Sequence, residues 1–290
     1  MQINQTKTLY HYTTMSTLCS LLNNLEFVSL NANNTEEALA QYKLKFWISD
    51  NCYMNDPTES YFFLNSLGNA LDFYQKKHCL LDKTTLFELG FSVWDQMQGY
   101  KYILSLSECR DSLSMWRAYG ANGQGVALGF NVEKLQEFIV QSEALQLFKV
   151  NYIDTIDCIN SFSDEELQKM YDSIEMKNNG DGSCSMEVIQ ELTEKRHLYY
   201  KNEAYKDERE WRIVSITNGN CYFRERTGII VPYCELGIPI NILDSIIIGP
   251  CAEQKRSKYT LSRMFYHKVG GLVEDSRIPI INSNIPYTVQ

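Results

Sequence analysis

Two glutamates and an arginine stand at every second position of the stretch DEREWRIV, residues 207–214. In an extended strand alternate side chains share a face, so Glu208, Glu210 and Arg212 are predicted to lie on one face. The opposite face would carry Arg209, Trp211 and Ile213, of which the last two are predicted core residues. A carboxylate pair on a buried strand is costly unless it is ion-paired or takes part in chemistry. Two interpretations remain open: a working carboxylate pair, or a structural ladder in which Arg212 bridges both glutamates.

The residues after this strand predict its neighbour. Asn218-Gly219 tolerates the positive φ angles of a tight turn, so residues 216–222 are typical of a β-hairpin. The charged strand is therefore predicted to be an interior strand with an antiparallel partner.

A second concentration of polar and flexible residues lies between residues 101 and 130. Lys101–Ser107 alternates as a strand, with Tyr102, Leu104 and Leu106 on its apolar face. A short helix, 113–119, and a Gly-x-Gly loop lead into the next predicted strand, 126–130. This loop lacks the third glycine of a dinucleotide fingerprint and enters a strand instead of a helix. The candidate pocket residues of this unit are Ser107, Trp116, Arg117 and Tyr119; for Trp116 and Tyr119 a place in the core is the alternative.

His11 is one of only four histidines and lies in a predicted strand, Leu9–Tyr12, just before a helix that Thr13 or Thr14 would cap. Ligands are often held at such strand-to-helix junctions. The alternative is a structural histidine that is satisfied by its neighbours.

The remaining segments are typical of scaffold. Asp56-Pro57 is explained as the start of a helix, and a further helix is expected over residues 84–98. Ser163 opens a capping box, and residues 243–249 are predicted to form a buried strand. Strands and helices are interleaved without a domain boundary, so the sequence predicts one α+β domain, residues 1–290, with a helical insertion at about 160–201.

Composition excludes several classes of protein. The 290 residues are 44% hydrophobic and 12% aromatic, enough for a sizeable core, and the net charge of −9 argues against wholesale binding to a phosphate backbone. Neither a membrane-spanning run nor a signal peptide is evident. Nine scattered cysteines without a Cys-x-x-Cys pair predict a reduced cytoplasmic protein, with mostly buried thiols and no metal site.

A set of short motifs, taken in order, resembles the bacterial family called domain of unknown function 2971, and the resemblance extends over nearly the whole chain. The motifs are Leu9-Tyr10-His11-Tyr12, Asn55-Asp56-Pro57-x-Glu59, Ser105-Leu106-Ser107, Met115-Trp116-x-x-Tyr119-Gly120, Gly125-Val126, Glu208-x-Glu210-Trp211-Arg212 and Ile246-Ile247-Ile248-Gly249.

More distantly, the chain resembles the ADP-ribosyltransferase superfamily. That resemblance implies a split, mostly antiparallel sheet that clamps NAD, with surrounding helices. By position, His11 with Tyr12 beside it would hold a ribose hydroxyl, and Ser107 or Tyr119 would lie beside the nicotinamide. Glu210 would be the catalytic glutamate, and Glu208 would complete a Glu-x-Glu pair.

The chemistry implied by this resemblance is coherent. Breaking the bond between nicotinamide and ribose develops an oxocarbenium-like cation, which Glu210 would stabilise while Glu208 orients or deprotonates the attacking group. Arg117 or Arg212 would neutralise the pyrophosphate, and Trp116 or Tyr119 would stack on a ring.

Two hypotheses follow. The first is an NAD-processing enzyme that modifies a protein or nucleic acid or hydrolyses NAD, as a toxin or phage-defence effector. The second is a non-catalytic module that binds a nucleotide or a partner protein, with a structural Glu/Arg strand.

Overall fold

A computed structural model describes residues 7–28, 35–54, 59–83, 100–176, 182–184, 198–217, 221–226, 228–269 and 278–288. Its helices are α1 (Met15–Asn23), α2 (Thr35–Ala40), α3 (Glu59–Lys77), α5 (Leu113–Ala118), α6 (Val132–Val140), α7 (Thr155–Asn160), α8 (Asp164–Ser173) and α10 (Gln254–Val269), with 3-10 turns η1 (Asn51–Tyr53), η2 (Ala121–Gly123), η3 (Glu203–Glu208) and η4 (Ile240–Ile242).

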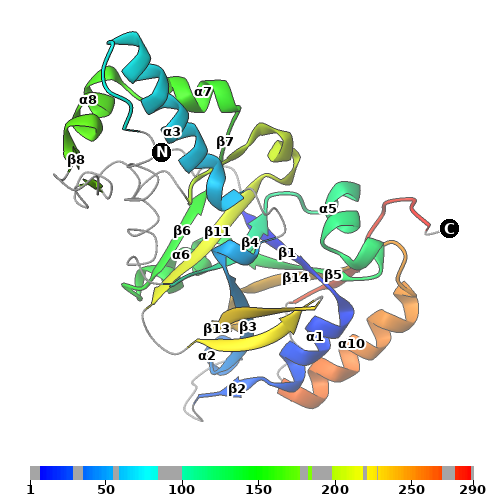
Figure 1. Cartoon of the computed structure of the whole chain (residues 1–290). Coiled ribbons are helices and arrows are strands. Elements are labelled where there is room, and N and C mark those ends of the chain that lie inside the picture. Colours follow the sequence, from blue (N-terminus) through cyan, green and yellow to red (C-terminus); the bar gives the residue numbers. More distant parts are fainter. Residues whose placement is uncertain are drawn as a thin grey trace.

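An eleven-stranded sheet forms the centre of the molecule (Figure 1). Its strands are β1 (Thr8–Thr13), β2 (Glu26–Phe27), β3 (Tyr42–Asp50), β4 (Tyr100–Ser107), β5 (Val126–Asn131), β6 (Leu145–Lys149), β11 (Glu210–Thr217), β12 (Tyr222–Arg226), β13 (Ile229–Pro239), β14 (Leu243–Ile248) and β15 (Ile280–Asn282). All described pairs in it are antiparallel except β14–β15. The predicted α+β class with a mostly antiparallel sheet is therefore confirmed.

The sheet divides at β4. One edge of this strand pairs along its whole length with β11, from Glu210↔Ser107 to Thr217↔Tyr100. The other edge meets two different strands: β3 at Ile103 and β1 at Ser107. Since β3 and β1 reach β4 at separate points, they diverge from each other and leave room for a pocket between them.

One face of the sheet carries the largest apolar core. The alternation predicted for β4 is confirmed, because Tyr102, Leu104 and Leu106 are buried there together with Trp211 and Ile213 of β11. Helices α1, α6 and α10 cover this face, and α1 lies beside α10 (Figure 1). Thr14 caps α1 by accepting a hydrogen bond from the Thr17 backbone, one of the two residues predicted for this role.

Helices α3, α7 and α8 gather at another end of the molecule around their own core (Figure 1). Phe63 and Leu67 of α3 pack there with Leu167 and Met170 of α8. The capping box predicted at Ser163 is present, with Glu166 as its second member. The predicted insertion, about 160–201, includes α8 and the short strands β8 (Ile174–Met176), β9 (Gly182–Cys184) and β10 (Tyr200–Asn202). Of these, β10 pairs in parallel with β7 (Asn151–Ile153).

Three local predictions are corrected. Strand β11 begins only at Glu210, because Arg209 adopts a left-handed conformation with φ of 44° and Glu208 ends η3; Arg209 is therefore exposed and not on the core face. The expected hairpin is wrong, since β4 and β6 occupy both edges of β11 and β12 pairs with β13. Of the eight cysteines whose side chains the structure describes, all unpaired, only Cys158 and Cys234 are buried, so most of these thiols are not.

Several predictions fall outside the described residues. They are the Asn55-Asp56-Pro57 helix start, the helix at 84–98, the Asn218-Gly219 turn, and most of the helix expected before residue 201.

Candidate functional site

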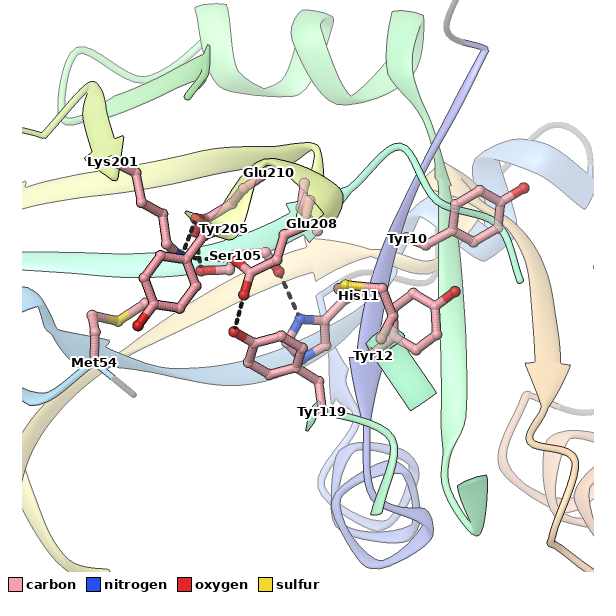
Figure 2. A pocket seen from close by; sticks show the side chains of 12 residues that line it. Tyr10, His11, Tyr12, Met54, Ser105, Tyr119, Lys201, Tyr205, Glu208 and Glu210 are labelled. Carbon is pink, nitrogen blue, oxygen red and sulfur yellow. Dashed lines mark hydrogen bonds and ion pairs between the residues drawn. The ribbon is translucent and has the colours of Figure 1, made fainter. Parts of the chain in front are cut away.

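A pocket with a volume of about 140 Å³ lies where β1, β4 and β11 meet (Figure 2). Its walls are built from Tyr10, His11, Tyr12, Met54, Ser105, Leu106, Met115, Tyr119, Lys201, Tyr205, Glu208 and Glu210. Four tyrosines and two methionines make much of the wall apolar, while the two carboxylates and the lysine supply the charge. The pocket therefore combines flat apolar surfaces with fixed charged groups.

Glu210 is held by a set of donors behind the pocket wall. Arg212 donates to both of its carboxylate oxygens, at 3.0 Å from Nε and 3.1 Å from Nη2. The Ser105 hydroxyl donates to Oε1 at 2.7 Å. These residues share a face because Glu210 and Arg212 of β11 lie opposite Ser107 and Ser105 of β4. With donors on both oxygens, the surroundings favour the ionised carboxylate, although burial raises the pKa of Glu210.

Lys201 joins the two glutamates. Its Nζ lies 2.8 Å from Glu208 Oε2 and 3.0 Å from Glu210 Oε2, as Figure 2 shows. Burial lowers the pKa of Lys201, but the two carboxylates outweigh burial, so its pKa is raised and the ammonium group stays charged. One cation thus holds two carboxylates close together in a buried position.

The two carboxylates differ in their access to the pocket. The Glu208 side chain is 17% exposed and that of Glu210 only 4%. Glu208 Oε1 accepts a hydrogen bond of 2.7 Å from the Tyr119 hydroxyl, whose pKa is raised by burial and by Glu208 itself. Tyr119 is therefore a phenol that donates to Glu208 and not a phenolate.

The chain conformation around Arg209 places both glutamates next to Lys201. The left-handed turn at Arg209 separates η3, which ends with Glu208, from β11, which begins with Glu210. The turn is fixed by the Arg209 carbonyl, which accepts from the Glu108 backbone at 3.1 Å, and by the Glu208 carbonyl, which accepts from Ser107 Oγ at 2.6 Å. In a regular strand, the side chains of Glu208 and Glu210 would instead lie on one face, at the fixed spacing of residues two apart.

His11 lies at the fork of the sheet. Its Nδ1 is 3.0 Å from the backbone carbonyl of Ser105, on the β4 edge between the points where β3 and β1 attach. Since a carbonyl only accepts, Nδ1 carries the hydrogen and Nε2 is left as an acceptor. Burial lowers the pKa of His11, which favours this neutral form.

The structure brings together five of the nine predicted site residues on the pocket wall: His11, Tyr12, Tyr119, Glu208 and Glu210. Arg212 lies behind the wall, where it also donates to the Leu198 carbonyl at 2.9 Å. The catalytic and binding roles of these residues remain predictions.

The other three predicted residues lie elsewhere. Ser107 is buried, and its hydroxyl accepts from the Cys109 backbone at 2.9 Å while donating to the Glu208 carbonyl, so it holds the chain and does not face the pocket. Trp116 is fully buried, and its Nε1 donates to Asp111 at 2.6 Å. Arg117 lies over the Tyr287 ring, 4.9 Å from its centroid. The core alternative for Trp116 is therefore correct.

Sequence reasoning missed Lys201 and Ser105 as site residues. The sequence pattern could have indicated Ser105, because Ser105 shares a strand face with Ser107 two residues away. No sequence pattern indicated Lys201, since it lies at the end of a predicted helix and nothing there points to a contact with residues 208 and 210.

The pocket opens into a wider groove with a volume of about 850 Å³. The two cavities share His11, Tyr12, Met54, Ser105 and Tyr119. From there the groove extends over β3 to β12 and β13, where Trp47, Arg224 and Arg226 line it. A ligand larger than one ring therefore has a continuous path from the pocket.

The described ranges carry neither a metal site nor a membrane-spanning helix. These residues contain no group of three or more His, Cys, Asp or Glu side chains arranged to hold a metal ion. Nor does any helix in this part of the chain combine the length and apolar character that a membrane crossing requires.

The comparisons with known proteins give one match. The family described as Protein of unknown function (DUF2971) matches residues 115–213, which include Tyr119, Lys201, Glu208, Glu210 and Arg212. The match is narrower than the sequence resemblance, which extended to His11 and to residues 246–249. No curated protein and no solved structure matches the chain.

Proposed function

We propose that the pocket binds the nicotinamide end of NAD and that the protein is an NAD-processing enzyme, an ADP-ribosyltransferase or NAD glycohydrolase. The observation that carries the proposal is the pair of carboxylates, Glu208 and Glu210, joined by Lys201 at the wall of a tyrosine-rich pocket. Flat aromatic walls suit a planar, positively charged ring, because the faces of aromatic rings attract cations. Preorganised carboxylates suit a reaction in which positive charge develops on ribose.

The sizes of the two cavities are consistent with this ligand. A cavity of about 150 Å³ holds a benzene-sized ring, and the pocket volume is about 140 Å³. The ribose, diphosphate and adenosine would then follow the adjoining groove of about 850 Å³. His11 lines both cavities, and its Nε2 is suited to accept a hydrogen bond from a ribose hydroxyl.

Accessibility favours an exchange of the roles that the sequence suggested. Glu208 is the more exposed carboxylate and would face the developing oxocarbenium ion. Glu210 already accepts from Arg212, Ser105 and Lys201, so it would act as a positioning residue that holds Lys201. Tyr119 would orient Glu208 through its hydrogen bond.

The acceptor of ADP-ribose in this proposal is water or a macromolecule, protein or nucleic acid. Either reaction would consume NAD, in keeping with a role as a toxin or phage-defence effector. NAD enters as a substrate, and the proposed reaction uses no metal ion.

A second candidate is a non-catalytic module that binds a nucleotide or a partner protein. It is favoured by the surroundings of Glu210, since a carboxylate with donors on both oxygens and 3% residue exposure also fits a purely structural role. The two candidates differ in whether NAD is consumed.

The test is nicotinamide release from NAD by the purified protein, measured by chromatography. Glu208→Gln removes the charge and keeps the shape, so we expect a loss of about 10²–10³ in rate with nearly unchanged thermal melting. Glu203→Gln is the matched control, because Glu203 lies on the same 3-10 turn and is exposed. It should retain full activity.

Wild-type protein that binds NAD in calorimetry but releases no nicotinamide would support the non-catalytic module. Full activity in a folded Glu208→Gln protein would remove this residue from the mechanism. The absence of both binding and turnover would reject NAD as the ligand.

A further inference from the structure

The outer end of the groove carries two arginines on one strand. Arg224 and Arg226 are two residues apart on β12, so they share a face of the sheet, and both line the groove. On the neighbouring strands Trp47 and Tyr233 form an aromatic floor, with ring centroids 5.0 Å apart. This end of the groove therefore presents cations over flat rings.

Arg224 is positioned by neutral groups. Its Nη2 donates to the Ser49 hydroxyl at 2.8 Å, and its guanidinium lies 5.5 Å from the Tyr233 ring and 5.9 Å from the Trp47 ring. A second donor, Nε, is buried without a hydrogen-bond partner among the described residues. A guanidinium has five N–H donors, so Arg224 keeps donors for a ligand while its plane is held by the rings.

Arg226 lies close enough to Arg224 for the two positive charges to repel each other. Arg226 donates to the Tyr53 carbonyl at 3.4 Å. Burial lowers the pKa of Arg224, and the nearby Arg226 lowers it further, because two cations at close range repel each other. An anion between them would relieve that repulsion.

Among the described residues that line the groove, Lys45 is a third cation, and its surroundings differ from those of the two arginines. Lys45 lies 3.7 Å from Glu26 and 3.6 Å from Glu235, so two carboxylates already offset its charge. The chain as a whole has a net charge of −9, which disfavours general attraction of anions. A cationic subsite in this groove is therefore a local feature centred on the two arginines.

We propose that Arg224 and Arg226 form a subsite for a phosphate or diphosphate group, over the aromatic floor of Trp47 and Tyr233. Arginine is suited to this role because its planar fork binds phosphate oxygens in pairs. Assigning the group to the diphosphate of NAD rests on the proposed function, whereas the subsite itself does not. The subsite replaces Arg117 and Arg212 as the expected phosphate ligands, because these two lie away from the groove or behind the pocket wall.

The experiment is calorimetric titration of the full chain with inorganic pyrophosphate and, separately, with ADP-ribose, at an ionic strength of about 0.1 M. We expect Arg224→Gln and Arg226→Gln each to weaken pyrophosphate binding about tenfold or more, because each loses charge-assisted hydrogen bonds. Arg263→Gln is the matched control, since Arg263 also lies over a tyrosine ring, Tyr259, but on α10. This control should bind pyrophosphate as the wild type does.

Failure of the subsite and failure of the proposed function give different results. The subsite would be overturned if pyrophosphate did not bind the wild type, or if it bound all variants equally. This holds whether or not the protein consumes NAD. Pyrophosphate binding that requires both arginines, in a protein that does not consume NAD, would support the subsite and reject the enzyme. Melting temperatures of the variants within a few degrees of the wild type would ensure that lost binding is not lost folding.

Discussion

The two ends of the groove carry charge in opposite ways. At the pocket end, Glu210 and Arg212 have at most 3% of their residue surface exposed. The charge of Glu210 is paired with Arg212 and with Lys201. At the outer end, Arg224 contacts a hydroxyl and two aromatic rings and retains a donor without a partner among the described residues.

This difference separates what holds the site from what meets a ligand. A buried ion pair depends on each partner, because removing one leaves an uncompensated charge in a poorly solvated position. A cation on an open groove is partly solvated, so its removal affects stability little and ligand binding strongly. Substitution of the buried pair Glu210 and Arg212 is therefore expected to reduce stability strongly, and substitution of the outer arginines only weakly.

The largest effect on stability is expected for Arg212→Ala. It removes two hydrogen bonds to Glu210 and one to the Leu198 carbonyl, and should reduce the free energy of unfolding by about 3–5 kcal/mol. Chemical denaturation measures this, with exposed Arg256→Ala as the control. A loss below about 1 kcal/mol would show that the pair is not a structural element.

A smaller loss of stability is expected for Ser105→Ala. The Ser105 hydroxyl donates to the charged Glu210 at 2.7 Å, so its removal should reduce the free energy of unfolding by about 1.5–3 kcal/mol. The control is Ser262→Ala on α10, whose exposed hydroxyl donates to a neutral carbonyl of its own helix. Equal losses in the two variants would contradict the special position of Ser105.

A smaller effect, on the pH dependence of folding stability, is expected from His11. Burial lowers its pKa from the ordinary value of 6.5, so in the window below pH 6.5 the unfolded chain binds the proton more readily than the folded protein. The stability that neutral His11 contributes is present above pH 6.5 and is lost as pH falls from there towards the lowered pKa.

Melting temperatures between pH 7.5 and about 5 measure this effect. The fall should be shallower in His11→Gln than in the wild type, and unchanged in His267→Gln, which replaces an exposed histidine of α10. Parallel curves for the wild type and His11→Gln would show that His11 does not titrate differently on folding.

The smallest effect on stability is expected for Arg224→Gln. The variant loses ring contacts of the kind worth about 0.5–1 kcal/mol at exposed positions and gains relief from the neighbouring Arg226, so the net change should be below about 1 kcal/mol. Chemical denaturation beside Arg212→Ala tests the contrast between the two ends. A loss as large as that of Arg212→Ala would make the outer arginine structural too.

The sequence determined the features that depend on near neighbours. Alternation fixed the core face of β4, and the positions of Trp211 and Ile213 in the core follow from the same period of two. The capping box at Ser163 and the Thr14 cap are local hydrogen-bond patterns, so their residues could be read directly. One of the two open interpretations had Arg212 bridging both glutamates. Arg212 does pair with Glu210, two residues away on the same face of the strand, but Lys201 is the residue that joins the two glutamates.

Only the tertiary structure decided which strands pair and which side chains complete the site. The sequence of the long strand β13 favours a β-strand only weakly, since it contains prolines and its first two isoleucines are exposed. The left-handed turn at Arg209 interrupts a stretch whose pattern favours a continuous strand. Lys201 reaches both carboxylates because β10 pairs with β7, a contact between segments about fifty residues apart. Such contacts arise from the packing of whole elements, and the local sequence carries no record of them.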